Sequence, residues 1–103
     1  MAGFVKVAKT EEIPEGGFKS FEVDFTRFVV AHTTDGYFAF IDECTHDSEP
    51  FGKGKLKGNE IVCTRHGARF DVRSGTVTAP PAIVPLDTFE VKVEGDDIFV
   101  RLD

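Results

Sequence analysis

Both cysteines of the chain and two of its three histidines fall within one short stretch, CTHDSEPFGKGKLKGNEIVCTRH, which runs from Cys44 to His66. They form two matched pairs, Cys-x-His and Cys-x-x-His, with sixteen residues between the pairs. Such a set could serve four chemistries: a disulfide, a cysteine nucleophile with a histidine base, a mononuclear metal site or a metal cluster. Compartment and spacing help to separate them.

The first two chemistries fit the sequence poorly. Residues 1–15, MAGFVKVAKTEEIPE, lack the continuous apolar run of a signal peptide, and no other segment approaches a membrane span, so we expect a cytoplasmic protein. In a reducing compartment, two cysteines are more often ligands or free thiols than a disulfide. A nucleophile needs one base, so a duplicated Cys-His dyad has no use in a single active site.

Metal binding fits better, because thiolate and imidazole are ligands both for zinc and for iron-sulfur centres. Structural zinc sites usually combine a Cys-x₂₋₄-Cys knuckle with a His-x₃₋₅-His pair, whereas each pair here mixes the two residue types. In an extended loop, residues two apart point the same way with about 6–7 Å between them. Cys44 and His46 therefore suit two neighbouring iron atoms better than one zinc ion, and a structural zinc module stays as an alternative.

The elements that must position these residues are short strands. Alternating apolar residues, turn signals between them and the lack of a long helical stripe predict an all-β antiparallel sandwich or barrel. At 103 residues the chain is expected to form a single domain with a core built on Phe and Val. Expected strands lie near Phe4 and over Phe18–Phe25, Arg27–His32, Tyr37–Ile41, Phe89–Val93 and Ile98–Leu102.

Both Cys-His pairs are expected in loops that leave strands. Cys44 follows the strand ending at Ile41. The dipeptide Gly58-Asn59 suits a two-residue hairpin turn with glycine at a positive φ, and Cys63 is then expected just past the returning strand. A third loop, Thr78–Ala82, contains two prolines that cannot belong to a central strand.

The middle of the chain differs from its flanks. Residues 43–82 are poorer in alternating apolar residues, which predicts a loop-rich subdomain inserted into a base subdomain of about 1–42 and 83–103.

The net charge of −6 excludes a generic nucleic-acid binder, which would need basic residues to neutralise phosphates. Residues 51–73 nevertheless carry a local charge of +4, which surrounds the second Cys-His pair. A solvated hairpin beside an acidic body is the simplest interpretation, and a docking surface for an acidic partner is the alternative. The basic residues are Lys53, Lys55, Lys57, Arg65, Arg69 and Arg73, against Glu60 and Asp71.

Taken together, CTH at 44–46 and CTRHG at 63–67 resemble the cluster-binding signature of Rieske proteins. The likeness continues through HGARFDVRSGTV, the proline loop and the final hairpin, and the length resembles the small Rieske ferredoxins that serve ring-hydroxylating oxygenases. This resemblance implies one 2Fe-2S cluster per chain, with Cys44 and Cys63 on one iron and His46 and His66 on the other. Residues 43–82 would then be the cluster-binding subdomain.

The resemblance also implies further roles. Pro80 and Pro81 would correspond to the loop that covers the cluster. High-potential relatives carry an extra disulfide beside the cluster, and a serine and a tyrosine after the second ligand pair. This chain has no further cysteines and has Ala68 and Phe70 in those places, so a low reduction potential is expected.

The function implied is that of a carrier without substrate chemistry of its own. It would take one electron from a flavin-dependent NAD(P)H ferredoxin reductase and pass it to a terminal oxygenase of the aromatic-ring-hydroxylating dioxygenase type. We expect a monomer with no nucleic-acid or membrane partner. A second alternative resembles the small subunit of assimilatory nitrite reductase, which has the fold but lacks the cluster. The third histidine, His32, is predicted to be structural or at the surface. Tyr37 and Phe38 could form an electron conduit, but their alternating strand favours packing in the core.

Overall fold

The computed structural model describes residues 3–45, 49–52, 54–63 and 67–102. Within these ranges the chain forms ten strands and one three-residue 3₁₀ turn, Thr10–Glu12, which confirms the all-β prediction. No helix in the described ranges is long and apolar enough to cross a membrane. The strands are β1 Phe4–Lys9, β2 Phe18–Val23, β3 Thr26–Thr33, β4 Gly36–Ile41, β5 Lys55–Lys57, β6 Glu60–Cys63, β7 Ala68–Asp71, β8 Val77–Ala79, β9 Thr88–Glu94 and β10 Asp97–Arg101.

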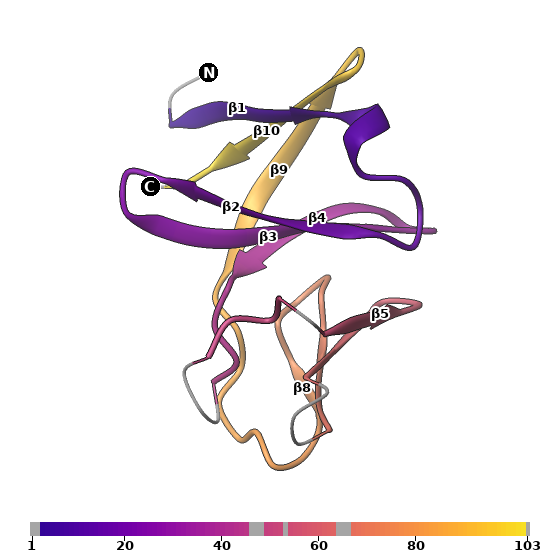
Figure 1. The fold of residues 1–103 in the computed structure, drawn as a ribbon, viewed down its shortest axis with the longest axis vertical. Coiled ribbons are helices and arrows are strands. Elements are labelled where there is room, and N and C mark those ends of the chain that lie inside the picture. Colours follow the sequence, from indigo (N-terminus) through magenta and orange to yellow (C-terminus); the bar gives the residue numbers. More distant parts are fainter. Residues whose placement is uncertain (1–2, 46–48, 53, 64–66, 103) are drawn as a thin grey trace.

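The strands form two antiparallel sheets. The larger has the order β1-β10-β9-β4-β3-β2, so that the two ends of the chain supply neighbouring strands, and the smaller has the order β5-β6-β7-β8. Figure 1 shows the two sheets one above the other along the long axis, with both termini beside the larger sheet. The chain passes to the smaller sheet after β4 and returns through β9 (Figure 1).

The β2–β3 hairpin corrects the expected strand Phe18–Phe25. Strand β2 ends at Val23, and Asp24 and Phe25 form the turn with φ of 49° and 66°. Positive φ is costly for a bulky side chain and is usually adopted by glycine or asparagine, so a turn at Phe25 was not expected from the sequence. The side chain of Phe25 is 98% exposed.

The hairpin turn at Gly58-Asn59 is confirmed, but two boundaries near it differ from expectation. Gly58 has a positive φ, as predicted, with a value of 59°, and Lys57 pairs with Glu60 across the two-residue turn. Cys63, however, is the last residue of β6 rather than the residue after it, because it still pairs with a residue of β7. The expected proline loop is shorter than Thr78–Ala82, since β8 includes Thr78 and Ala79; both prolines follow this edge strand, joined by a cis peptide bond.

The core has two hydrophobic clusters built mainly on Phe, Val and Ile. One includes Phe28 and Ile98 of the larger sheet. The other lies between the sheets, where Phe51 packs edge-on against Phe40 of β4 and Phe70 of β7, with ring centroids 5.7 and 5.8 Å away. All five side chains have 0% exposure, which confirms the predicted Phe-rich core.

Asp35, in the turn between β3 and β4, connects the two sheets through polar contacts. The side-chain amide of Asn59, in the β5–β6 turn, donates to the Asp35 carboxylate at 2.8 Å. Arg73, just after β7, lies 3.4 Å from the same carboxylate and 2.8 Å from that of Asp71. These contacts hold the β5–β6 turn and the end of β7 against the β3–β4 turn of the larger sheet.

Replacing Asp71 by Asn is expected to flatten the acid dependence of stability. Hydrogen bonds from the Arg73 side chain hold the pKa of Asp71 below its ordinary value of 3.8, with burial opposing them. A lowered pKa contributes stability that is present above the unfolded value and is lost as the pH falls through the folded one. Urea unfolding between pH 7 and pH 3 should show a steeper loss below pH 3.8 for wild type than for Asp71→Asn. Asp24→Asn is the control, because asparagine tolerates the positive φ there. Equal pH dependence in wild type and Asp71→Asn would contradict the prediction.

Candidate metal centre

The two cysteines lie in the hydrophobic cluster between the sheets. Cys44 and Cys63 have 0% and 1% exposure and are not joined in a disulfide. Their cluster also contains Phe51, Phe70 and Ala82, from three different segments of the chain. Two thiols buried together in apolar surroundings are inert as nucleophiles unless a base reaches them, but they can supply the soft ligands of a metal centre shielded from water.

The first candidate ligand loop, residues 42–51, contains Cys44 and is held by backbone and side-chain contacts. The Cys44 amide donates to the carbonyl of Glu49 at 2.8 Å, which joins the two described parts of the loop. The Thr45 hydroxyl donates to the carbonyl of Val84 at 2.6 Å, which ties the loop to the segment that follows Pro80 and Pro81. The loop therefore lies against the proline segment, although the two are far apart in sequence.

The second ligand loop joins β6 to β7. Cys63 at the end of β6 is paired with Ala68 at the start of β7. The amide of Gly67 donates to the Cys63 carbonyl at 2.7 Å, and Gly67 has a φ of 80° that favours glycine. The pairing with β7 and the hydrogen bond from Gly67 thus fix the position of the Cys63 backbone at the end of β6.

His46 and His66 lie outside the described residues, so their positions relative to the cysteines stay a prediction. Within the described ranges, no group of three His, Cys, Asp or Glu side chains gathers to hold a metal ion. The third histidine has a structural role, as predicted: His32 Nδ1 lies 2.9 Å from the Ile13 carbonyl, and its ring stacks on Tyr37 at 4.0 Å. Tyr37 and Phe38 pack against the two core clusters, also as predicted.

The wall beside the cysteines is apolar on the β7 side. Ala68 and Phe70 both have 0% exposure and belong to the same cluster as Cys44 and Cys63. Neither side chain has a hydrogen-bond donor, so neither can donate to a sulfur atom.

The charges on the smaller sheet are partly paired. Arg69 lies 3.4 Å from Glu60, and Arg73 pairs with Asp71 and Asp35. Lys55 and Lys57 are exposed at alternate positions of β5, whereas Lys53 and Arg65 lie outside the described residues. Ion pairing therefore reduces the positive charge expected from the sequence at Arg69 and Arg73. Lys55 and Lys57 are exposed basic residues outside these pairs.

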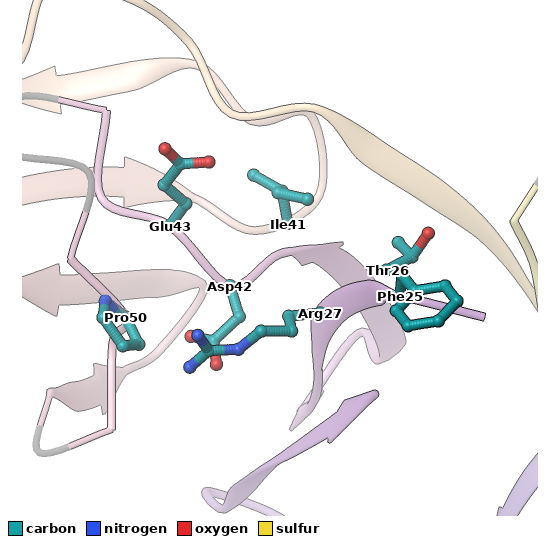
Figure 2. Close-up of a pocket in the computed structure, with 7 residues that line it drawn as sticks. All are labelled: Phe25, Thr26, Arg27, Ile41, Asp42, Glu43 and Pro50. Atoms are coloured by element: carbon teal, nitrogen blue, oxygen red, sulfur yellow. The ribbon is translucent and has the colours of Figure 1, made fainter. Parts of the chain in front are cut away.

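A cavity of about 320 Å³ lies beside the start of the first ligand loop. Figure 2 shows its lining side chains, which come from the β2–β3 turn, the start of β3, the end of β4 and both ends of the loop. Asp42, which is 6% exposed, accepts a hydrogen bond from the Phe51 amide at 2.9 Å. Asp42 and Thr45 were not among the residues predicted from the sequence. Short polar side chains close to a candidate ligand can hydrogen-bond to the loop backbone, and this signal could have identified them. The lining residues are Phe25, Thr26, Arg27, Ile41, Asp42, Glu43 and Pro50.

Comparison with known proteins identifies the class of this fold and site. The family model of the Rieske 2Fe-2S domain matches residues 3–90. The chain is 37% identical over 98 residues to the ferredoxin component of biphenyl 2,3-dioxygenase from Rhodococcus jostii, covering 95% of this chain and 92% of that protein. It is 32% identical over 91 residues to the ferredoxin component of the naphthalene 1,2-dioxygenase system from Pseudomonas aeruginosa, covering 88% of each chain.

Solved structures agree with this class. The ferredoxin of carbazole 1,9a-dioxygenase from Nocardioides aromaticivorans superposes with a TM-score of 0.92 at 31% identity, covering 99% of this chain and 100% of that one. A second match, with a TM-score of 0.89 at 30% identity over 96% and 93% of the chains, comes from a complex of reduced oxygenase and oxidized ferredoxin in carbazole 1,9a-dioxygenase.

The chain therefore belongs to the Rieske 2Fe-2S family, among the ferredoxin components of aromatic dioxygenase systems. As such it is an electron carrier and not itself the catalyst of oxygenation, and its cofactor is a Rieske 2Fe-2S cluster. This assignment favours the ferredoxin interpretation over a zinc module and over a cluster-free relative of the nitrite reductase small subunit.

Proposed function

We propose that Cys44 and Cys63 hold one iron of the 2Fe-2S cluster and that His46 and His66 hold the other. Support for this ligand set comes from the burial of both thiols in one apolar cluster, which suits sulfur ligands that must be kept from water. The residues present therefore fit the cofactor of the family. When bound, the cluster supplies a site that takes up and releases one electron.

The chain contributes burial, orientation and a surface. The Cys44 and Cys63 backbones are fixed by the hydrogen bonds from Cys44 to Glu49 and from Gly67 to Cys63, so the thiolates need little reorganisation to bind. Phe51, Phe70 and Ala82 exclude water from the cysteine side. His46 and His66, as the ligands expected at the exposed edge, would be the point at which electrons enter and leave.

The proposed division into subdomains follows from the same assignment: residues of about 43–82 bind the cluster, and about 1–42 and 83–103 form the base. The four-stranded sheet, which falls between residues 55 and 79, supports this division. The cytoplasmic location and the monomeric state stay predictions of the sequence.

The partners proposed are a flavin-dependent NAD(P)H ferredoxin reductase as donor and a terminal oxygenase as acceptor. The carbazole 1,9a-dioxygenase ferredoxin, which this chain resembles at 30% identity, was solved in a complex with its oxygenase, and this supports the acceptor. The test is stopped-flow mixing of the reduced protein with a purified terminal oxygenase of the aromatic-ring-hydroxylating dioxygenase type. The proposal predicts oxidation of the ferredoxin within the turnover time of that oxygenase. A reduced ferredoxin that stays reduced through many turnovers would contradict it.

The exposed lysines of β5 are proposed to steer an acidic patch of the redox partner toward the cluster. Lys55 and Lys57 project at alternate positions of one strand, and the sequence places Lys53 and Arg65 nearby. Attraction between exposed charges is screened over about 8 Å at physiological ionic strength, so it affects mainly the association rate.

Reversing Lys55 to Glu is expected to slow electron transfer to the oxygenase severalfold at low ionic strength and to have little effect at high ionic strength. Lys92→Glu on β9 is the matched control, because Lys92 is exposed on the larger sheet beside Glu94. The readout is the second-order rate constant at several salt concentrations. Equal rate constants for Lys55→Glu and wild type at low salt would exclude a steering role. A faster rate for Lys55→Glu would point to a basic partner surface.

A further inference from the structure

Asp42 is a buried carboxyl residue that the electron-transfer assignment does not use. It follows β4 directly and is 6% exposed, in a chain where most other acidic residues lie at the surface. Asp42 stands two residues before Cys44, at the point where the chain leaves the larger sheet for the ligand loop. A buried carboxyl group is costly unless its oxygens are hydrogen-bonded, so its partner indicates what it does.

The partner of Asp42 lies at the other end of the same loop. Its Oδ1 accepts the hydrogen bond of the Phe51 amide at 2.9 Å, in a buried position. The backbone amide of Asp42 in turn donates to the Arg27 carbonyl of β3 at 3.0 Å, which anchors Asp42 to the larger sheet. Asp42 therefore joins the start and the end of the loop to a rigid strand.

The Phe51 residue that Asp42 binds is also part of the hydrophobic cluster around the two cysteines. Its side chain has 0% exposure and packs edge-on between Phe40 and Phe70, which belong to opposite sheets. Inside the closed loop, the Cys44 amide donates to the Glu49 carbonyl at 2.8 Å. Figure 2 shows Asp42 and Pro50, the neighbour of Phe51, lining the same cavity.

We propose that Asp42 is a positioning residue, which closes the first ligand loop through the Phe51 amide and so holds Cys44 in place for the cluster. This inference rests on the proposed ligand set. Without the acceptor, the Phe51 amide is left buried and unsatisfied, and the loop loses the contact that fixes its far end. The expected consequence is a cluster that is lost faster, rather than a change in the global fold alone.

The test compares Asp42→Ala and Asp42→Asn, purified with the cluster, with wild type. Cluster loss is followed by the decay of visible absorbance in the presence of an iron chelator. Removal of the acceptor should accelerate the loss by about tenfold or more in Asp42→Ala. Asparagine keeps an oxygen acceptor at the same position, so Asp42→Asn should stay within about threefold of wild type.

Thr33→Val is the matched control. Thr33 is 3% exposed, and its hydroxyl accepts the Asp35 amide at 3.0 Å in the β3–β4 turn. This variant deletes a comparable bond from a side chain to an amide in a different loop. Its thermal midpoint should fall, whereas its rate of cluster loss, measured at the same interval below its own midpoint as for wild type, should be unchanged.

The outcomes separate a positioning role from a general structural one. Fast loss in Asp42→Ala, rescue by asparagine and unchanged loss in Thr33→Val support the proposal. It is overturned if Asp42→Ala keeps the wild-type rate, if Thr33→Val accelerates the loss equally at matched stability, or if Asp42→Asn is as fast as Asp42→Ala. If Asp42→Ala cannot be purified, deuterium exchange at the Phe51 amide decides: protection in wild type and Asp42→Asn supports the bond, and free exchange in wild type overturns it. A wild-type protein that binds no cluster would instead contradict the proposed ligand set.

Discussion

Replacing His66 by Ala is expected to abolish the visible absorption of the protein and to lower its unfolding temperature. In the proposed ligand set, this change removes one of the two imidazole ligands, and the remaining donors cannot complete the coordination of the iron that His46 and His66 would hold. Metal binding is coupled to folding in small metal domains, so loss of the cluster should also weaken the fold. Visible absorption, iron content and thermal unfolding are the measurements.

His32→Ala is the matched control for this substitution. His32 is the histidine whose ring contacts the Ile13 carbonyl and Tyr37, away from both ligand loops. Its removal should cost on the order of 1 kcal/mol of stability, from one hydrogen bond and one stacking contact, and leave the absorption unchanged. An unaltered spectrum in His66→Ala, or equal loss of iron in both variants, would show that His66 is not a ligand.

The reduction potential of the wild-type protein is expected at the low end of the Rieske range of roughly −150 to +300 mV. With two thiolates, two sulfides and two ferric ions the oxidised centre is neutral, so donors aimed at its sulfur atoms favour the reduced, negatively charged form. Ala68 and Phe70 are buried beside the cysteines and offer no donor. A hydrogen bond to a charged group contributes about 1.5–3 kcal/mol, and about 1.4 kcal/mol corresponds to 59 mV for one electron. Relative to a protein with serine and tyrosine at positions 68 and 70, the two missing hydroxyls should therefore lower the reduction potential by about 130–260 mV.

Phe70→Tyr is expected to raise the potential by about 60–130 mV if its hydroxyl reaches a cysteine sulfur. Ala68→Ser should act in the same direction through a bridging sulfide. Phe40→Tyr is the control, since Phe40 is equally buried and meets Phe51 with the same edge-on geometry from the larger sheet. Protein-film voltammetry near neutral pH gives the values. A wild-type potential above about +100 mV, in the upper part of the family range, would mean that other donors control the cluster.

Most of the larger sheet could be predicted from sequence because its strands are five to eight residues long and rich in Phe, Val and Ile. Apolar and polar residues alternate in outer strands such as β9, whereas β3 and β4 are more continuously apolar. The β2–β3 turn could not, since Asp24 and Phe25 replace the glycine or asparagine that normally marks positive φ. Strands β7 and β8 were also missed. They span four and three residues, too few for a period to stand out. The pairing of β7 with β6, and of β8 with β7, determines their position more than local propensity does.

The candidate ligands could be predicted because their chemistry lies in residue types and spacing, which a single sequence displays. The contacts that hold the backbone beside the candidate ligands could not be predicted. The contacts from Thr45 to Val84 and from Asp42 to Phe51 join residues 39 and nine positions apart, and they exist only once both sheets have packed. The pairing of Arg69 with Glu60 likewise depends on the β6–β7 register and reduces the positive charge expected there.

The most direct test of the proposed cluster ligands is pulsed electron–nuclear double resonance on the dithionite-reduced protein, prepared with ¹⁵N-labelled histidine. The proposed ligand set predicts the paramagnetic signal of a reduced 2Fe-2S cluster with two coupled histidine nitrogens. His32→Ala should leave both couplings in place, and His66→Ala should remove the signal. A colourless protein that contains zinc, or a reduced cluster with fewer than two coupled histidine nitrogens, would contradict the assignment of Cys44, His46, Cys63 and His66 as its ligands.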